Sequence, residues 1–392
     1  MIATRLRPGV DAGSLWRSLA PGLLSAALLV AIGIELAVLV AWVPDTTRHV
    51  IHVEPGDWGN LYIRARHLRL MGLYSPLLTP LLFPISLAGI INGYRILFAL
   101  NVVAALTIAW IAQRPLRSPE ARVAVALAVI SLPQLQWAIR FGHVTPLLAL
   151  AALGGLLLVQ RHPKRGAALL AAMSIKPQYA VAPFVYLASR RQFRLLALMI
   201  AVSAAGAAIG FAVAGPSSVV TYVGYALNWG PNSTQNLMPV QQAWMYSWPG
   251  FLVSIGLEPN RLVSTDLLLL SAAVAAVACA RLDARRAVVV VPLAMILVTP
   301  YSQFYDACLI TVAFALVLRA GLRPGFAGGM IAILYAAALV TQVNTHFPVQ
   351  DLLGPASTNG PFWLTPALLA AIAALALSGR APAAVEEAPV GG

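Results

Sequence analysis

The segment between the first two apolar stretches of the chain, residues 44–93, places an acid ahead of several cations. Its candidate reactive and binding residues are Asp57, Tyr62, Arg64, Arg66 and Arg69. The carboxylate of Asp57 could accept the proton of an attacking hydroxyl, and guanidinium groups match the geometry of phosphate. If a helix begins at Asp57, then Leu61, Ala65 and Leu68 share one face, which predicts an extracytoplasmic amphipathic helix along the membrane surface. In the alternative interpretation, Asp57 only caps this helix and the arginines pair with anionic headgroups.

A lysine interrupts the apolar segment 166–189, in whose middle Lys176-Pro177-Gln178 stands. A cation at bilayer depth costs about 2.5 to 3.5 kcal/mol and commonly marks a functional site. Pro177 disfavours helical geometry at Lys176, so we predict two short half-helices or a re-entrant hairpin with Lys176 near its apex. Such irregular backbone has to line protein or a wet cavity. Alternatively, Lys176 snorkels to the interface or pairs with a carboxylate such as Asp306.

Further polar side chains stand at the predicted outer ends of apolar segments. Arg140 and His143 lie in a turn between two such segments, and Tyr305 and Asp306 begin another. The loop 228–248 mixes amides with aromatic rings, among them Asn232, Gln235 and Trp244. Indoles stack on sugar rings and amides bond sugar hydroxyls, but an aromatic belt at the membrane interface has the same composition.

The composition of the chain decides which elements can position these residues. It has 392 residues, of which 60% are hydrophobic and 10% are charged. Soluble domains carry about 25% charged residues, so the bilayer is the solvent here, and we predict an all-α polytopic membrane protein. The apolar stretches predict a bundle of about ten transmembrane helices besides the re-entrant hairpin. These spans are expected at 18–42, 94–112, 121–138, 144–160, 194–214, 265–280, 286–300, 304–319, 325–343 and 362–378.

The distribution of charge predicts how the chain crosses the membrane. Most of the 26 lysines and arginines fall in segments that this scheme places on one side, which predicts that those segments and both termini are cytoplasmic. The net charge of +13 is therefore a topology signal and not a sign of nucleic-acid binding. We expect one transmembrane domain over 1–378 and a disordered cytoplasmic tail over 379–392. The long outer loops are expected at 44–93, 215–264 and 344–361.

Taken together, these residues resemble the GT-C glycosyltransferases, and specifically glycosyltransferase family 87, the polyprenyl-phosphate-mannose-dependent mannosyltransferase type. The motifs that carry the resemblance are Gly56-Asp57 with Tyr62, Gly72-Leu73-Tyr74, Phe141-Gly142-His143, Ile175-Lys176-Pro177-Gln178 ahead of Arg190-Arg191, and Thr299-Pro300-Tyr301 with Tyr305-Asp306. These short motifs extend over most of the chain in the expected order. One departure bears on the choice of sugar or acceptor: the family commonly has Gly-Gln-x-Asn where this chain has Gly142-His143-Val144-Thr145.

The resemblance implies a bacterial inner-membrane enzyme with a GT-C-like bundle. Such an enzyme moves a hexose, here mannose, from a polyprenyl-phosphate donor to a lipid or glycan acceptor at the extracytoplasmic face. The configuration inverts, and no nucleotide sugar, cofactor or metal is used. The resemblance implies that Asp57 is the general base. From the residue types and positions described above, we expect donor-phosphate binding by Lys176, Arg64, Arg66, Arg69 and Arg140. We expect substrate binding by Tyr62, His143, Gln178, Asn232, Gln235, Trp244, Tyr305 and Asp306. The competing interpretations are a multi-span transporter or flippase of a lipid-linked or small polar substrate, and a catalytically inactive scaffold.

Overall fold

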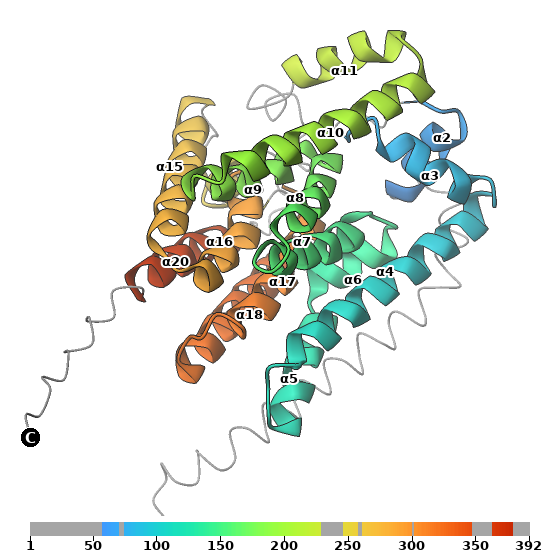
Figure 1. Cartoon of the computed structure of the whole chain (residues 1–392). Coiled ribbons are helices and arrows are strands. Elements are labelled where there is room, and N and C mark those ends of the chain that lie inside the picture. Colours follow the sequence, from blue (N-terminus) through green and yellow to red (C-terminus); the bar gives the residue numbers. More distant parts are fainter. Residues whose placement is uncertain are drawn as a thin grey trace, which may run out of the picture.

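The computed structural model describes residues 57–69, 74–228, 246–257, 261–299, 302–346 and 363–378. These residues form sixteen α-helices and two 3₁₀ helices and contain no strand (Figure 1). The α-helices are α2 (Asp57–Arg66), α3 (Leu78–Ser86), α4 (Ile90–Gln113), α5 (Pro119–Ile130), α6 (Pro133–Arg140), α7 (Thr145–Val159), α8 (Pro163–Leu170), α9 (Pro177–Ser189), α10 (Phe193–Ala214), α11 (Ser217–Asn228), α14 (Trp248–Ser254), α15 (Arg261–Arg281), α16 (Ala284–Leu297), α17 (Ile310–Val317), α18 (Pro324–His346) and α20 (Leu364–Ser378). The 3₁₀ helices are η1 (Ala171–Ile175) and η2 (Phe304–Leu309). The predicted all-α class is therefore confirmed for the described residues.

Four of these helices are long and apolar enough to cross a membrane. They are α4, α10, α15 and α18, and they confirm the predicted apolar helices at 94–112, 194–214, 265–280 and 325–343. The predicted spans 144–160 and 362–378 correspond to the shorter apolar helices α7 and α20, and 304–319 to the helical stretch Tyr305–Val317. The total of about ten spans stays a prediction, and the first predicted span, 18–42, lies outside the described residues.

The segment predicted as a single span at 121–138 is a bent pair of helices. α5 and α6 meet at an angle of 49° and are separated by Ser131 and Leu132. Leu132 has an extended backbone (φ −61°, ψ 116°) because it precedes Pro133, the first residue of α6. The bend turns α6 toward η2, with which it is in contact.

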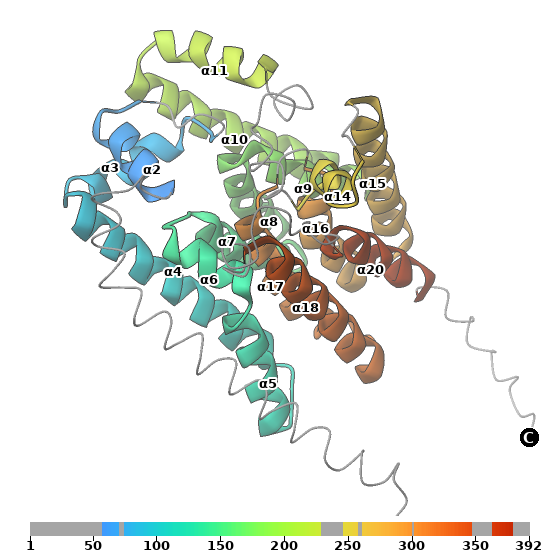
Figure 2. The ribbon, with the colours of Figure 1, turned by 180° about the vertical axis from the view of Figure 1, so that it is seen from behind.

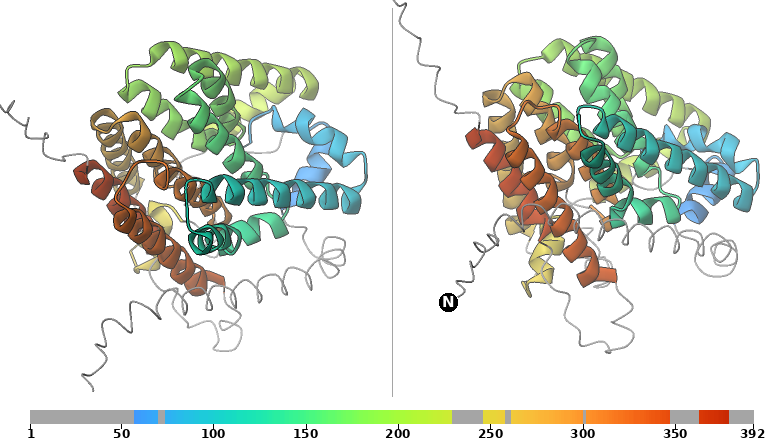
Figure 3. Two further views of the ribbon diagram at one scale, coloured as in Figure 1. Left: turned by 60° about the horizontal axis from the view of Figure 1, so that its bottom comes forward. Right: turned by 90° about the horizontal axis from the view of Figure 1, so that it is seen from below.

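Two short helices form the centre of the bundle. Every residue of α17 is buried, and so is every residue of α16 from Ala287 onward. A helix that is apolar on all sides lies either inside a bundle or against lipid, and these two helices lie inside the bundle. Here α4 and α7 pack on α17, while α9, α15 and α20 pack on α16 (Figure 2), and α18 lies beside α20 (Figure 3). By contrast, α10 buries only Met199, Gly206 and Gly210.

The chain breaks at Lys176, as Pro177 predicted. α8 continues into η1, Lys176 itself is extended (φ −111°, ψ 95°), and α9 begins at the proline. The two half-helices on either side of Lys176 are therefore confirmed for this segment, while the re-entrant path through a membrane stays a prediction.

Arginine side chains cap helix C-termini at one end of the bundle. The contacts are those of Arg190 with the carbonyl oxygens of Cys279 and Leu282, of Arg286 with that of Ser378, and of Arg319 with those of Ala315 and Ile111. Cations are stabilised there because the C-terminal end of a helix carries a negative partial charge. At this end of the bundle α9, α15, α17 and α20 finish and α16 begins. The start of α9, the start of α17 and the last turn of α16 therefore lie at the opposite end, and Lys176 lies there with them.

The amphipathic helix predicted in the first outer loop is present as α2. It begins at Asp57, and Leu61 and Ala65 are buried on its inner face. The helix ends at Arg66, earlier than the pattern through Leu68 implied, because Leu68 adopts a left-handed backbone with φ 52°. α3, α11 and α14 are further helices within the two longest predicted loops.

Candidate active site

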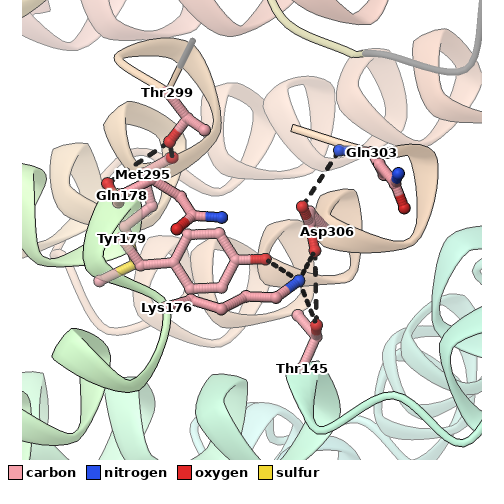
Figure 4. Close-up of polar contacts among 8 residues, drawn as sticks. All are labelled: Thr145, Lys176, Gln178, Tyr179, Met295, Thr299, Gln303 and Asp306. Carbon is pink, nitrogen blue, oxygen red and sulfur yellow. Dashed lines mark hydrogen bonds and ion pairs between the residues drawn. The ribbon is translucent and has the colours of Figure 1, made fainter. Parts of the chain in front are cut away.

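The centre of the site is a buried ion pair between two segments far apart in the chain. Lys176 Nζ lies 2.6 Å from Asp306 Oδ1, and the two side chains are 4% and 1% exposed (Figure 4). The hydroxyl of Thr145 lies 3.4 Å from each of these two atoms, accepting from the ammonium and donating to the carboxylate. The pairing of Lys176 with Asp306, which the sequence left as an alternative, is therefore the arrangement that this structure has.

Asp306 is also held by its own helix. Its second carboxylate oxygen, Oδ2, accepts the amide hydrogen of Gln303 at 3.1 Å, just before η2 begins. A carboxylate in the first turn of a helix is stabilised by the free amide groups there. Asp306 thus has a partner that does not depend on Lys176.

Aromatic rings surround the ammonium of Lys176. Its Nζ lies 4.8 Å from the ring centroid of Tyr305 and 5.3 Å from those of Tyr74 and Tyr179. The phenol of Tyr179 also accepts a hydrogen bond from Nζ at 3.4 Å. These contacts lie within the range of cation–π attraction, which is strongest where water is excluded.

Three helices start at this ion pair. α7 begins with Thr145, α9 begins directly after Lys176, and η2 begins just before Asp306. The N-terminal end of a helix carries a positive partial charge and unpaired amide hydrogens, and it favours anions. Lys176 and Asp306 together carry no net charge. The positive partial charges of the three helix ends therefore make this region favourable to a bound anion.

The segment predicted as the first outer loop reaches the site through Tyr74 and Ser75. The amide of Ser75 donates to the carbonyl oxygen of Ile175 at 2.8 Å, one residue before Lys176. Together with the ring of Tyr74 over the ammonium, this contact joins the loop that carries Asp57 to the break in the chain. The backbone of Asp57 is the start of α2, and its side chain lies outside the described part of the structure.

The turn that contains Arg140 and His143 lies against the same site. The ring of His143 stacks on Tyr305, with 3.3 Å between the ring centroids, so Tyr305 is a neighbour of both His143 and the ammonium of Lys176. α4 fixes this turn, because its Tyr94 donates to the carbonyl oxygen of Arg140 and its Asn101 to that of His143, both at 2.8 Å.

Gln178 places a buried polar side chain near the ion pair. It is the second residue of α9 and is 5% exposed, and its amide points toward Asp306 (Figure 4). Its Oε1 atom has no hydrogen-bond partner among the described residues. A buried acceptor of this kind is costly unless a ligand or water satisfies it.

The remaining predicted binding residues lie on α2, just after it, or outside the described part of the structure. Arg64, Arg66 and Arg69 lie on or just after α2, where Arg66 and Arg69 are exposed, and Tyr62 packs against the core. Asn232, Gln235 and Trp244 lie outside the described residues. Within those residues, no group of three His, Cys, Asp or Glu side chains could hold a metal ion.

The structure adds Tyr179 and Thr145 to the site. Tyr179 follows Lys176 by three residues, so a helix beginning at Pro177 was a signal that the two side chains are neighbours. Thr145 occupies the last position of the motif Gly142-His143-Val144-Thr145, where the family that the sequence resembles commonly has asparagine. Both family departures in this motif, His143 and Thr145, therefore belong to the site.

Comparison with known proteins identifies one family. Residues 73–300, more than half of the chain, match the model of glycosyltransferase family 87. The matched region contains Lys176, Thr145 and Tyr179, and it ends shortly before Asp306. No curated protein and no solved structure matches the chain.

Proposed function

The chain belongs to glycosyltransferase family 87, and we propose that it moves a hexose, specifically mannose, from a polyprenyl-phosphate donor to a lipid or glycan acceptor. The family makes it a membrane glycosyltransferase with a sugar donor and an acceptor. The lipid phosphate, the sugar and the side of the membrane belong to the proposal. The observation that carries it is the buried ammonium of Lys176 at the start of three helices.

A lipid phosphate suits this position for electrostatic and geometric reasons. The region is enclosed by apolar helices, as a site for a membrane-embedded donor has to be. The helix N-termini favour a phosphate over a neutral group, and the ammonium of Lys176, although paired with Asp306, can donate a hydrogen bond to it. In a site of low dielectric, these charges also stabilise the negative charge that develops on a leaving phosphate. The free Oε1 of Gln178 could accept a hydrogen bond from a sugar hydroxyl.

In the proposed reaction, the oxygen of an acceptor hydroxyl attacks the anomeric carbon of the donor from the face opposite the phosphate. The new glycosidic bond forms as the bond between the anomeric carbon and the phosphate oxygen breaks, and the configuration inverts. Polyprenyl phosphate leaves with the bonding electron pair, and the proton of the hydroxyl passes to the carboxylate of Asp57. An ordinary carboxylate within hydrogen-bond reach is sufficient for this role.

The proposed site faces the extracytoplasmic side of a bacterial inner membrane. Arg190, Arg286 and Arg319 lie at the opposite end of the bundle, and the exposed cations Arg161, Lys164 and Arg165 follow α7. Arginines and lysines are enriched in cytoplasmic segments, so this end is assigned to the cytoplasm together with both termini.

Purified protein in liposomes that contain radiolabelled polyprenyl-phosphate mannose and a lipid extract as acceptor tests the proposal. We expect label to move into a new glycoconjugate, and Lys176→Met to reduce the rate by about 100-fold or more. The chain has only one other lysine, the exposed Lys164, and Lys164→Met is the matched control that should retain the wild-type rate. Movement of the labelled donor across the bilayer without a new product would instead indicate a transporter and overturn the proposal.

A further inference from the structure

Two glycines of α10 provide the surface on which the first outer loop rests. A Cβ atom added to Gly210 would fall on the carbonyl carbon and oxygen of Pro76 and lie 2.5 Å from the amide nitrogen of Leu77. A Cβ atom added to Gly206, one turn earlier, would lie 2.8 Å from Cδ2 of the Leu77 side chain. The main chain at Pro76–Leu77 therefore lies directly against α10, at a distance that only glycine allows.

The seated segment is continuous with residues that contact Lys176. Ser75 and Pro76 are buried, and the Ser75 amide donates to Ile175 at 2.8 Å. Tyr74 places its ring 5.3 Å from the ammonium of Lys176. α10 itself contacts α3, which follows this segment (Figure 1), and η1, which precedes Lys176. One helix thus sets the separation between the outer loop and the break.

Glycines elsewhere in the chain show that the crowding at Gly206 and Gly210 is not a general property of its helical glycines. Gly325, Gly328 and Gly329 of α18 also lie within a long helix, yet a Cβ atom added to any of them would meet no atom within 4 Å. Glycine in a helix interior costs about 1 kcal/mol relative to alanine, so its presence at Gly210 opposes helix stability while permitting the contact with Pro76.

We propose that Gly206 and Gly210 are positioning residues for the transfer reaction, because they hold Tyr74 and Ser75 against the Lys176 break. The inference rests on the proposed function of that site. A methyl group at position 210 has to displace the main chain of Pro76 by about 1 Å, and a shift of that size in a positioned group can cost about 100-fold in rate. At position 206 the methyl group meets only the end of a flexible side chain, so the displacement is smaller.

Kinetics with the liposome assay test this proposal. We expect Gly210→Ala to lower kcat/KM for the donor by about 100-fold and Gly206→Ala by about tenfold, whereas Gly329→Ala is the matched control with the wild-type value. Leu77→Ala removes the atoms that collide with the methyl group of Gly206→Ala. The double variant Gly206→Ala, Leu77→Ala should therefore recover the kcat/KM of Leu77→Ala alone, while Gly210→Ala, which meets main-chain atoms, should not be rescued.

Hydrogen–deuterium exchange measures the loop without relying on activity. The peptide that contains Ser75 should exchange faster in Gly210→Ala than in the wild type or in Gly329→Ala, because its bond to Ile175 is lost. If the wild type showed no transfer, the proposed function would be refuted, but the exchange measurement would still test the contact between α10 and the loop. Wild-type exchange and wild-type kcat/KM in Gly210→Ala, or no rescue of Gly206→Ala by Leu77→Ala, would overturn the positioning role.

Discussion

The pair formed by Lys176 and Asp306 allows stability and catalysis to be separated with three variants: Lys176→Met, Asp306→Asn and the double variant. Both side chains are buried, and their charged atoms are 2.6 Å apart. At an effective dielectric constant of about 20, this distance corresponds to about 6 kcal/mol of attraction. The loss of hydration of the two ions offsets most of that attraction, so the pair itself contributes little net stability.

Removal of one partner has a different cost from removal of both. Each single variant leaves the other charge buried without its counter-ion, and we expect a loss of about 3 to 5 kcal/mol in the free energy of unfolding. The double variant leaves no buried charge at the site, so it should be at least about 2 kcal/mol more stable than the less stable single variant. Transfer should not follow this recovery, because the ammonium for the donor phosphate is absent from the double variant.

Denaturant unfolding in detergent and the liposome assay, performed on the same preparations, provide the two measurements. The expected result is a stability that recovers in the double variant with a transfer rate that stays at least about 100-fold below the wild type. Equal destabilisation in the double variant and the less stable single variant would show that the two charges are not coupled. Recovery of transfer together with stability would show that Lys176 acts only as a structural partner of Asp306.

Three further substitutions test other parts of the molecule. Asp57→Asn should insert and unfold like the wild type but lose about 100- to 10,000-fold in transfer rate, and wild-type turnover by the purified variant would exclude it as the general base. Tyr305→Ala removes the ring that stacks on His143 and lies 4.8 Å from the ammonium of Lys176, and it should raise the donor KM by about 3- to 30-fold, with Tyr305→Phe close to wild type in the same titration. Arg190→Ala should lower the free energy of unfolding by about 2 kcal/mol, because two carbonyl oxygens at the end of α15 lose the guanidinium that donates to them. The KM for the sugar donor should stay unchanged, and a changed KM would argue against a purely structural role.

Local features of the sequence were sufficient for the long helices and for the break at Lys176. The apolar runs in α4, α10, α15 and α18 predict these helices because a helix that crosses hydrocarbon needs about 20 such residues. Pro177 predicts the break because its effect acts on the preceding residue. The bend at Ser131–Leu132 has the same local cause in Pro133, but the continuous hydropathy of 121–138 concealed it. α16 and α17 were expected as spans, although the burial of α17 and of α16 from Ala287 onward became evident only in the bundle.

The sequence by itself determined that the chain is an α-helical membrane protein, that Lys176 stands at a helix break, and that its motifs resemble glycosyltransferase family 87. Only the tertiary structure decided that Lys176 pairs with Asp306, 130 residues away, that Thr145 bridges the pair, and that glycines of α10 seat the first outer loop. The physical reason is that hydropathy and proline act over neighbouring residues. An ion pair or a close backbone contact depends instead on how helices distant in the chain pack against one another.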